Sequence, residues 1–457
     1  MPRQGRPNVV VFFTDQQRWD TTGLGGNPSG LTPNLDRAGR AGTSLPLHFT
    51  CQPVCAPARS CLQTGQYATT TGVWRNGLGL RADAVTLAGC FGEAGYRTGY
   101  IGKWHLSASP EAGPVPPAAR GGYRDWLGAN ALEMVSEPYR TVMYDGEGAA
   151  VALPGYRVDA LTDAAIRYID ARAAEPDPFF LFVSYLEPHH QNHLDDYPPP
   201  AGYRERYTGA WMPPDLAALG GSSHQHLAGY YGMVARLDEA FGRLCDALIS
   251  LGLDDRTIVL FTSDHGCHFK TRNGEYKRSG HDASIHVPAV LQGPGFQGGG
   301  ALPQLVSLVD LPPTLLQACG LPVPPSMQGR SILPLLRRDP AATAAWPADV
   351  FVQISESQVG RAVRTRRWKY GVHAPDRNGG RDPDASRYVE EYLYDLEADP
   401  YELTNLLGLE SHAAVTAVLR ERLLRRMAEA GEARPEIVAA PQRRAGQRRV
   451  SAAEVQA

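Results

Sequence analysis

Apolar, β-branched runs alternate with helix-like segments through the first three quarters of the chain, and this alternation most narrows its possible folds. The run "NVVVFFT" at 8–14 predicts a buried strand, and Ile258–Thr262 predicts another. Between them, a segment around 237–248 places its leucines and a phenylalanine on one helical face. Strands that alternate with helices in this way favour an α/β fold. We therefore predict a large mixed, mostly parallel sheet sandwiched by helices.

Length and proline content suggest how the chain is divided. At 457 residues it exceeds one ordinary compact core, and proline and glycine become frequent before residue 340. Beyond that point, "RAVRTRRWKYGVH" and "EYLYDLEADPYELTNL" indicate strands and a turn. We predict a catalytic domain over 1–340, a smaller C-terminal α+β subdomain with an antiparallel sheet over 341–432, and a flexible or helical tail over 433–457.

Composition excludes several classes of partner. A formal net charge of -3 with 20% charged residues gives no basic surface for nucleic acid. The N-terminal apolar run is too short for a signal peptide, and no span is long enough to cross a bilayer, so we expect a cytoplasmic protein without a membrane partner. The seven cysteines are then expected to be reduced, and scattered ones such as Cys90, Cys245 and Cys319 to be small buried apolar residues.

Polar side chains follow four of the predicted strands, at the point where each strand ends. In open α/β sheets, ligands bind at the carboxyl ends of the strands, so four such endings predict one site. The residues are Asp15, Gln16, Lys103, His105, His189, His190, Asp264 and His265.

Two of these endings have the chemistry of a metal site. The carboxylates of Asp15 and Asp264, with Gln16 and His265 beside them, suit a divalent cation such as Ca²⁺, Mg²⁺ or Mn²⁺. Any one of these aspartates alone would more often cap the next helix. The lysines, histidines and arginine that surround this group would add positive charge suited to a tetrahedral oxyanion. They are Arg59, Lys103, His105 and Lys277.

The loop "CQPVCAPARSC" at 51–61 connects this chemistry to a known family. Its core "CAPAR", together with "FFTDQQR", "GKWHL", "TSDHG" and "LYDLEADPYELTNL", resembles the type I sulfatases of the alkaline phosphatase superfamily, over the chain to about residue 410. The resemblance implies an alkaline-phosphatase-like fold and hydrolysis of a sulfate ester. It also implies that a formylglycine-generating enzyme converts Cys55 to formylglycine (3-oxoalanine), whose hydrated aldehyde is the nucleophile.

The resemblance assigns roles residue by residue. Cys55 becomes the nucleophile, Arg59 stabilises its hydrated form, and Lys103 and Lys277 bind the sulfuryl oxygens. His189 protonates the leaving group, and His105 is the base that reforms the aldehyde. The metal, with Ca²⁺ as the first choice, lies on Asp15, Gln16, Asp264 and His265. Cys51 lacks an arginine four positions later, and Cys61 lacks both that arginine and the proline two positions later. Both are therefore expected to be packing residues that are not converted. Substrate contacts are expected from His190, His193 and His281.

The sequence leaves more than one substrate class possible. Hydrogen-bonding residues in "EPHHQNHLDDYPPP" and "HFKTRNGEYKRSGHD" favour a sulfated glycan or other carbohydrate sulfate, with an aryl sulfate second. Gln16 stands where the family usually has a second aspartate, and this is shared with some phosphonate monoester and phosphodiester hydrolases of the superfamily. A catalytically silent binding protein is the alternative from another class. The sequence leaves the oligomeric state undetermined.

Overall fold

The computed structural model, which describes residues 5–444, 446 and 449–455, is built around a nine-stranded mixed sheet. Its five central strands are parallel, and the strand pairings on both sides of them, out to each edge of the sheet, are antiparallel. In spatial order the strands are β2 (Thr43–Ser44), β10 (Ala289–Gln292), β9 (Thr257–Ser263), β1 (Asn8–Thr14), β8 (Phe179–Ser184), β4 (Arg97–Lys103), β5 (Asp125–Ala129), β6 (Thr141–Tyr144) and β7 (Ala150–Leu153). This confirms the predicted mixed, mostly parallel sheet.

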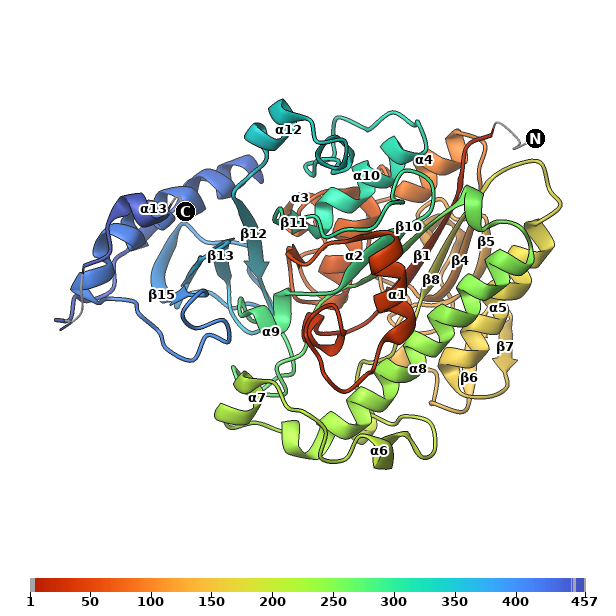
Figure 1. The fold of residues 1–457 in the computed structure, drawn as a ribbon, viewed down its shortest axis with the longest axis horizontal. Coiled ribbons are helices and arrows are strands. Elements are labelled where there is room, and N and C mark those ends of the chain that lie inside the picture. Colours follow the sequence, from red (N-terminus) through yellow and green to blue (C-terminus); the bar gives the residue numbers. More distant parts are fainter. Residues whose placement is uncertain (1–4, 445, 447–448, 456–457) are drawn as a thin grey trace.

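Helices cover both faces of the sheet because its central strands are apolar on both sides. In β1, Val9 and Val11 join one apolar core, while Val10 and Phe12 join the other. Helices α1 (Pro33–Ala41), α5 (Arg157–Arg172) and α8 (Ser223–Ser250) cover the face toward the viewer in Figure 1. Helices α2 (Cys55–Thr64), α4 (Leu87–Glu93) and α10 (Leu311–Ala318) pack on the opposite face.

A second, five-stranded sheet lies at the C-terminal side of the molecule, at the left of Figure 1. Its first four strands are antiparallel, as predicted, and α13 (Ala413–Glu429) packs against them. Asp282, the first residue of α9 (Asp282–Ile285), joins this sheet to the large one through ion pairs with Arg364 and Lys369. The strands are β12 (Asp349–Ile354), β13 (Gly360–Thr365), β14 (Trp368–His373), β15 (Arg387–Asp395) and β16 (Glu436–Val438).

The segment expected to be a flexible or helical tail differs in part from that expectation. β16 pairs in parallel with β15, and the side chain of Val455 in η8 (Ala452–Val455) is buried against the main core. Apolar side chains such as Ile437 therefore hold parts of this stretch on the body of the protein. Residues 445, 447–448 and 456–457 of the predicted tail lie outside the described residues. The predicted boundary near residue 340 stays a prediction.

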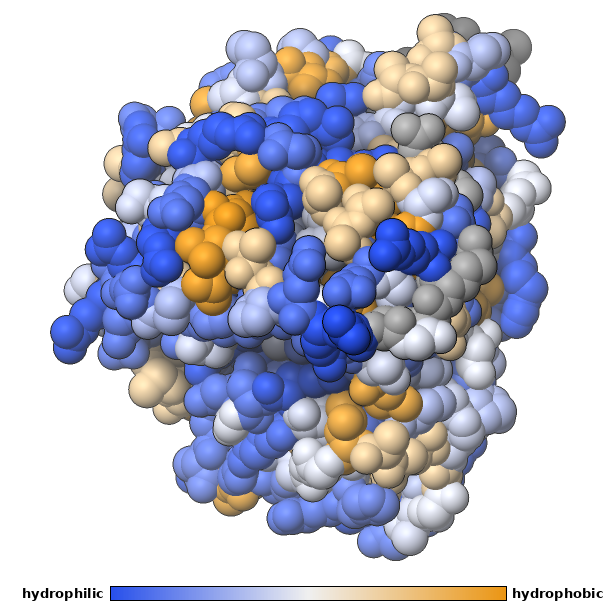
Figure 2. Space-filling view, turned by 90° about the vertical axis from the view of Figure 1, so that its left-hand side faces the viewer, coloured by the Kyte–Doolittle hydropathy of each residue, from blue (hydrophilic) through white to orange (hydrophobic). Residues whose placement is uncertain are grey.

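The remaining elements are short and lie at the surface or between the two sheets. They are β3 (His48–Phe49) paired with β11 (Val306–Ser307), and the helices α3 (Ala68–Thr71), α6 (Tyr203–Arg206), α7 (Pro214–Ala218), α11 (Leu333–Leu336) and α12 (Pro340–Ala345). Within the part of the chain that the structure describes, we find no helix with the length and apolar character needed to span a bilayer. The side that carries the C-terminal sheet is mainly hydrophilic, with small separate apolar patches (Figure 2).

Candidate active site

The predicted polar residues meet at the carboxyl edge of the large sheet. Asp15 follows β1, Lys103 ends β4, His189 follows β8 and Asp264 follows β9, and these four strands are neighbours in the sheet. The end of β4 depends on Gly102, which has a φ of +116°. A Cβ there would lie 1.9 Å from the main-chain oxygen of Ser184, so only glycine allows the two strand ends to approach this closely.

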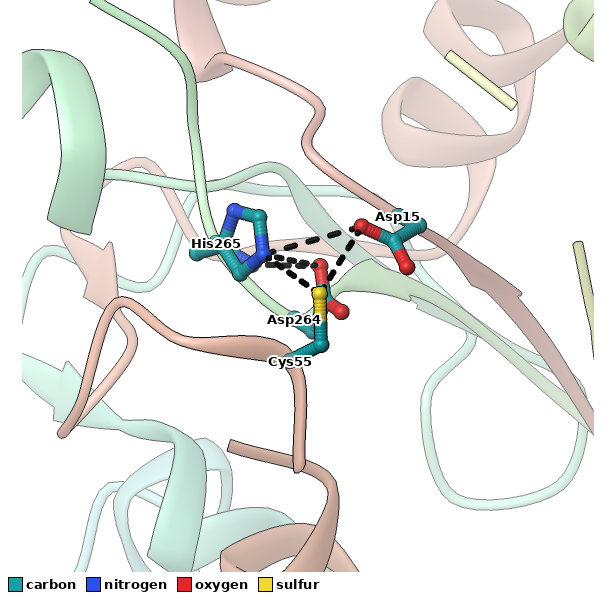
Figure 3. Close-up of side chains that lie close together, drawn as sticks. All are labelled: Asp15, Cys55, Asp264 and His265. Carbon is teal, nitrogen blue, oxygen red and sulfur yellow. Dashed lines mark hydrogen bonds and ion pairs between the residues drawn. The ribbon is translucent and has the colours of Figure 1, made fainter. Parts of the chain in front are cut away.

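Two carboxylates and an imidazole form the predicted metal centre (Figure 3). One ligand atom from each of Asp15, Asp264 and His265, with the sulfur of Cys55, lies within 4.8 Å of all the others. His265 Nδ1 is 2.9 Å from the main-chain oxygen of Gly266, so Nδ1 carries the proton and Nε2 faces the carboxylates as an acceptor. Nε2 is 3.6 Å from Asp15 Oδ1 and 3.5 Å from Asp264 Oδ1.

Gln16 lies beside this group, and its main-chain N–H donates to Asp264 Oδ1 at 3.0 Å. Its Nε2 donates to the hydroxyl of Tyr197 at 2.9 Å, while its Oε1 is buried and has no hydrogen-bond partner among the described residues. Its φ of 71° is in the left-handed region, a conformation that costs energy for a non-glycine residue. Two carboxylates, a free amide oxygen and an imidazole nitrogen fit a divalent cation.

Cys55 is the first residue of α2, and its sulfur lies at the centre of the charged groups. Sγ is 2.9 Å from Lys277 Nζ, 3.3 Å from His265 Nε2 and 3.8 Å from Lys103 Nζ. Burial would raise the pKa of the Cys55 thiol, but the charges of Lys103 and Lys277 outweigh it and hold the pKa well below its usual range. The site therefore stabilises negative charge at position 55.

Arg59 lies one helical turn after Cys55 on the same face of α2, because residues four apart in a helix are neighbours. Its Nη2 is 2.9 Å from Asp15 Oδ2 and 3.2 Å from Asp264 Oδ2. Its Nη1 donates to the main-chain oxygen of Lys103 at 3.0 Å. Among the described residues, the hydrogen bonds of Arg59 thus fix the carboxylates of Asp15 and Asp264 and the end of β4, and none joins Arg59 to the Cys55 side chain.

Lys277 and His189 form a hydrogen-bonded pair beside Cys55. Lys277 Nζ is 3.1 Å from His189 Nε2, and His189 Nδ1 is 2.6 Å from the main-chain oxygen of His190. Nδ1 therefore donates to that oxygen, and Nε2 accepts from the lysine. Burial and the Lys277 charge lower the pKa of His189, which keeps the imidazole neutral at neutral pH.

Glu133 was not predicted from the sequence. It lies in η3 (Leu132–Met134), and its Oε1 accepts a hydrogen bond from Lys103 Nζ at 2.9 Å. β5 is the parallel neighbour of β4, so its carboxyl end lies at the same edge of the sheet. A polar residue soon after β5 therefore indicates a candidate site residue, although Glu133 lies outside the motifs that carry the family resemblance.

The three predicted substrate-binding histidines lie in different surroundings. His190 stacks on His189 with 4.3 Å between ring centroids. His193 is half exposed and pairs with Glu137 at 3.4 Å. His281 is turned toward the C-terminal sheet, where its Nε2 is 3.2 Å from the hydroxyl of Tyr394. His281 thus contacts a tyrosine of the C-terminal sheet, whereas His190 adjoins the site through His189.

A cavity of about 790 Å³ opens beside the charged centre. His105, which has a φ of 60°, and Glu133 form its inner wall. Most of its other lining residues are polar, and Met134 is an exposed apolar one. They include Arg75, Asn76, Glu111, Glu137, Asn192 and His193. The cavity can therefore hold a polar substrate against His105 and Glu133, and Glu133 pairs with Lys103 beside Cys55.

Comparisons with known proteins agree with this chemistry. Residues 7–321 match the family described as Sulfatase, and residues 274–429 match the family described as N-sulphoglucosamine sulphohydrolase, C-terminal. The chain is 29% identical over 441 residues to the ulvan-active sulfatase of Formosa agariphila, covering 93% of this chain and 82% of that protein. It is 23% identical over 485 residues to the N-acetylglucosamine-6-O-sulfatase of Bacteroides thetaiotaomicron, covering 89% and 84%.

The fold also matches that of a solved structure. The sulfatase-like protein yidJ from Bacteroides fragilis superimposes with a TM-score of 0.83 at 25% sequence identity, covering 94% of this chain and 97% of that one. Both sheets therefore have counterparts in a known structure.

Proposed function

This chain belongs to the sulfatase family and is a sulfuric ester hydrolase, and we propose that its substrate is a carbohydrate sulfate, which it cleaves to an alcohol and inorganic sulfate. The observation that carries the proposal is the position of Cys55. Its sulfur lies between two lysines and a cluster of metal-type ligands, and one of these lysines, Lys103, pairs with Glu133 in the wall of a polar cavity.

Sulfatases generally use formylglycine and a divalent metal, and the buried group of Asp15, Cys55, Asp264 and His265 fits both. We propose that a formylglycine-generating enzyme modifies Cys55 and leaves Cys51 as a thiol. Burial raises the pKa of the Cys51 thiol, whereas charged neighbours hold that of Cys55 down. The hydrated aldehyde at position 55 would supply the attacking hydroxyl. Ca²⁺ is our first choice of cation, with Mg²⁺ and Mn²⁺ as alternatives.

The side chains around position 55 have distinct tasks. Lys103 and Lys277 offer two ammonium groups to the sulfuryl oxygens, where negative charge is concentrated. Arg59 keeps the carboxylates of Asp15 and Asp264 ionised and oriented. A divalent cation on Asp15, Gln16, Asp264 and His265 would supply further positive charge and lower the pKa of the attacking hydroxyl.

Proton transfer falls to the histidines and Lys277. Lys277 donates to His189 Nε2, so this pair can deliver a proton to the departing ester oxygen as general acid. His105 lines the cavity, and its Nδ1 has no hydrogen-bond partner among the described residues, which suits the base that allows the aldehyde to reform and sulfate to leave. The proton thus enters and leaves the reaction on different histidines.

The polar cavity and two relatives support the carbohydrate assignment. Arg75, Asn76 and Asn192 offer donors and acceptors at its wall, which suit sugar hydroxyls. The relatives are an ulvan-active sulfatase and an N-acetylglucosamine-6-O-sulfatase. A sulfated glycan is therefore the substrate class that we propose.

Gln16 favours a second candidate, a phosphonate monoester or phosphodiester hydrolase. A neutral amide in place of a carboxylate leaves the metal site more positive, which favours a substrate that concentrates its charge. A phosphonate monoester or phosphodiester shares its single negative charge between two non-bridging oxygens, whereas a sulfate ester shares it among three. Rates on 4-nitrophenyl sulfate and 4-nitrophenyl phenylphosphonate, measured on one preparation, separate the two. A dominant phosphonate rate would replace the sulfatase proposal.

The direct test is release of inorganic sulfate by protein made with a formylglycine-generating enzyme. We expect turnover of at least one pyranoside monosulfate in a panel of glucose, galactose and N-acetylglucosamine isomers. Cys51→Ala is the matched control, because Cys51 is a buried thiol in the same loop and should keep most activity. Hydrolysis of aryl sulfates alone would contradict the carbohydrate assignment.

A further inference from the structure

Glu133 is a buried carboxylate with one oxygen engaged and the other free. Its side chain is 8% exposed, and Oε1 pairs with Lys103 Nζ at 2.9 Å. Oε2 is buried and has no hydrogen-bond partner among the described residues. Buried charged oxygens are costly to leave unpaired, so such an atom beside a cavity indicates a place that a ligand completes.

Glu133 stays a carboxylate in this position. Burial would raise its pKa, but the neighbouring positive charge, above all that of Lys103, outweighs burial and lowers the pKa to about 2. An ionised carboxylate accepts hydrogen bonds and cannot donate them. The free oxygen can therefore accept a hydrogen bond from a donor group on a ligand in the cavity.

The position of Glu133 relates that donor to the reacting atom. Lys103 Nζ contacts both Glu133 Oε1, at 2.9 Å, and Cys55 Sγ, at 3.8 Å. Glu133 Oε1 therefore lies no farther from Cys55 Sγ than the sum of these two distances. Glu133 also shares the wall of the 790 Å³ cavity with His105, whose Nδ1 likewise has no partner among the described residues. A donor bound at Oε2 would therefore lie close to an ester held at position 55.

We infer that Glu133 is a specificity-determining residue that accepts a hydrogen bond from a hydroxyl or amino group on the carbon next to the sulfated one. This inference rests on the proposed function, because a sugar ring carries such a donor whereas a phenyl sulfate does not. The same carboxylate repels a second sulfate or a carboxylate at that carbon. The preferred substrate is then a pyranoside monosulfate with a free neighbouring hydroxyl or amine.

The test is a double-mutant-type cycle that changes Glu133 on the enzyme and the neighbouring hydroxyl on the substrate. kcat/KM is measured for wild type and Glu133→Gln on the fastest pyranoside monosulfate of the panel, and on its deoxy analogue that lacks the hydroxyl beside the sulfated carbon. Wild type should prefer the hydroxylated substrate by about 10-fold or more, as expected for a hydrogen bond to a charged group. In Glu133→Gln the preference should fall below about 3-fold, because a neutral amide is the weaker acceptor. Glu175→Gln, an exposed glutamate paired with Arg172, should leave the preference unchanged.

Two outcomes would overturn the inference. Equal loss on both substrates would mean that Glu133 only holds Lys103, and an unchanged preference would mean that Oε2 meets no donor. If no pyranoside sulfate is hydrolysed, the carbohydrate function fails, and the same cycle is run with catechol monosulfate and phenyl sulfate. A preference for the catechol ester that disappears in Glu133→Gln still supports the role of Glu133. Failure to hydrolyse any ester by formylglycine-containing protein overturns both proposals.

Discussion

Two buried charge clusters begin in the segment that follows β1, and they differ in how completely their atoms are paired. Arg18 forms the closed one. Its Nε and Nη2 bond Asp20 at 2.8 and 2.6 Å, both Nη atoms bond Asp215 at 3.0 Å, and Nη1 also reaches the main-chain oxygen of Cys267. All three guanidinium nitrogens have protein partners, so this cluster needs nothing from outside the chain.

The cluster around Cys55 starts only three residues earlier, at Asp15, and is open. Gln16 Oε1, His105 Nδ1 and Glu133 Oε2 are buried and lack partners among the described residues. The closed cluster stabilises the fold, whereas the open one keeps polar atoms available for a cation and a substrate. Between these two clusters, which are both buried and charged, the difference lies in how completely the polar atoms are paired.

The largest expected effect is on the open cluster. Cys55→Ala removes the proposed nucleophile, and sulfate release should fall by about 10⁴-fold or more, as for other enzymes that lose their nucleophile. The free energy of unfolding should change by less than about 2 kcal/mol, because only one small side chain is lost. Sulfate assays and urea unfolding on the same preparation measure both. Activity within tenfold of wild type would contradict the role of Cys55.

The closed cluster should respond in the opposite way. Arg18→Met leaves Asp20 and Asp215 buried without their cation, and we expect a loss of about 3–5 kcal/mol in the free energy of unfolding. Arg18→Lys keeps the charge but loses the forked geometry, so its loss should be smaller. Urea unfolding measures both variants. A change below about 1 kcal/mol in Arg18→Met would show that the cluster does not stabilise the fold.

Removal of the metal sharpens the same contrast. A chelator should abolish sulfate release, and Ca²⁺, Mg²⁺ or Mn²⁺ should restore it. Asp264→Asn should weaken cation binding by about 10-fold or more in isothermal titration calorimetry, because it removes a ligand charge. Asp215→Asn makes the same chemical change in the closed cluster and should lower stability while leaving the affinity for the cation unchanged. Equal affinity in both variants would exclude Asp264 from the metal site.

The smallest expected effect is a loss of stability in acid that is due to His268, which bonds the loop that carries Lys277. His268 Nε2 donates to the main-chain oxygen of Lys277 at 2.9 Å, and burial lowers the pKa of His268 from 6.5 to about 4. Between pH 6.5 and 4 the unfolded chain binds this proton and the folded protein does not, so stability falls as pH falls through that range. Relative to His268→Gln, wild type should lose about 2 kcal/mol of unfolding free energy between pH 7 and pH 5. A difference independent of pH would contradict a buried neutral His268.

Much of the fold and part of the site follow from local sequence pattern. The strand at 8–14 is apolar at every position, and the polar residues after four strands meet because parallel neighbours end at one edge. The spacing of Cys55 and Arg59 likewise places both on one face of α2. These features depend on periodicity and strand direction, which a sequence displays.

Other features depend on tertiary packing, which a sequence does not display. "DQQRWD" contains two aspartates, but only the structure shows that Asp15 faces the site while Asp20 pairs with Arg18. Glu133 reaches Lys103 from a short turn outside every motif. His281 stands near Lys277 in the sequence, yet it packs on tyrosines of the C-terminal sheet because α9 turns toward that sheet.

The central claim, that position 55 becomes a formylglycine within an open, charged cluster, is tested most directly by mass spectrometry of the peptide that spans residues 51–61. The protein should be made in its own host or together with a formylglycine-generating enzyme. We predict a mass lower by the difference between a thiol and an aldehyde, localised to Cys55, with Cys51 and Cys61 unchanged. An intact thiol at Cys55 in protein from its own host would contradict the account and would favour a catalytically silent sulfatase-like binding protein.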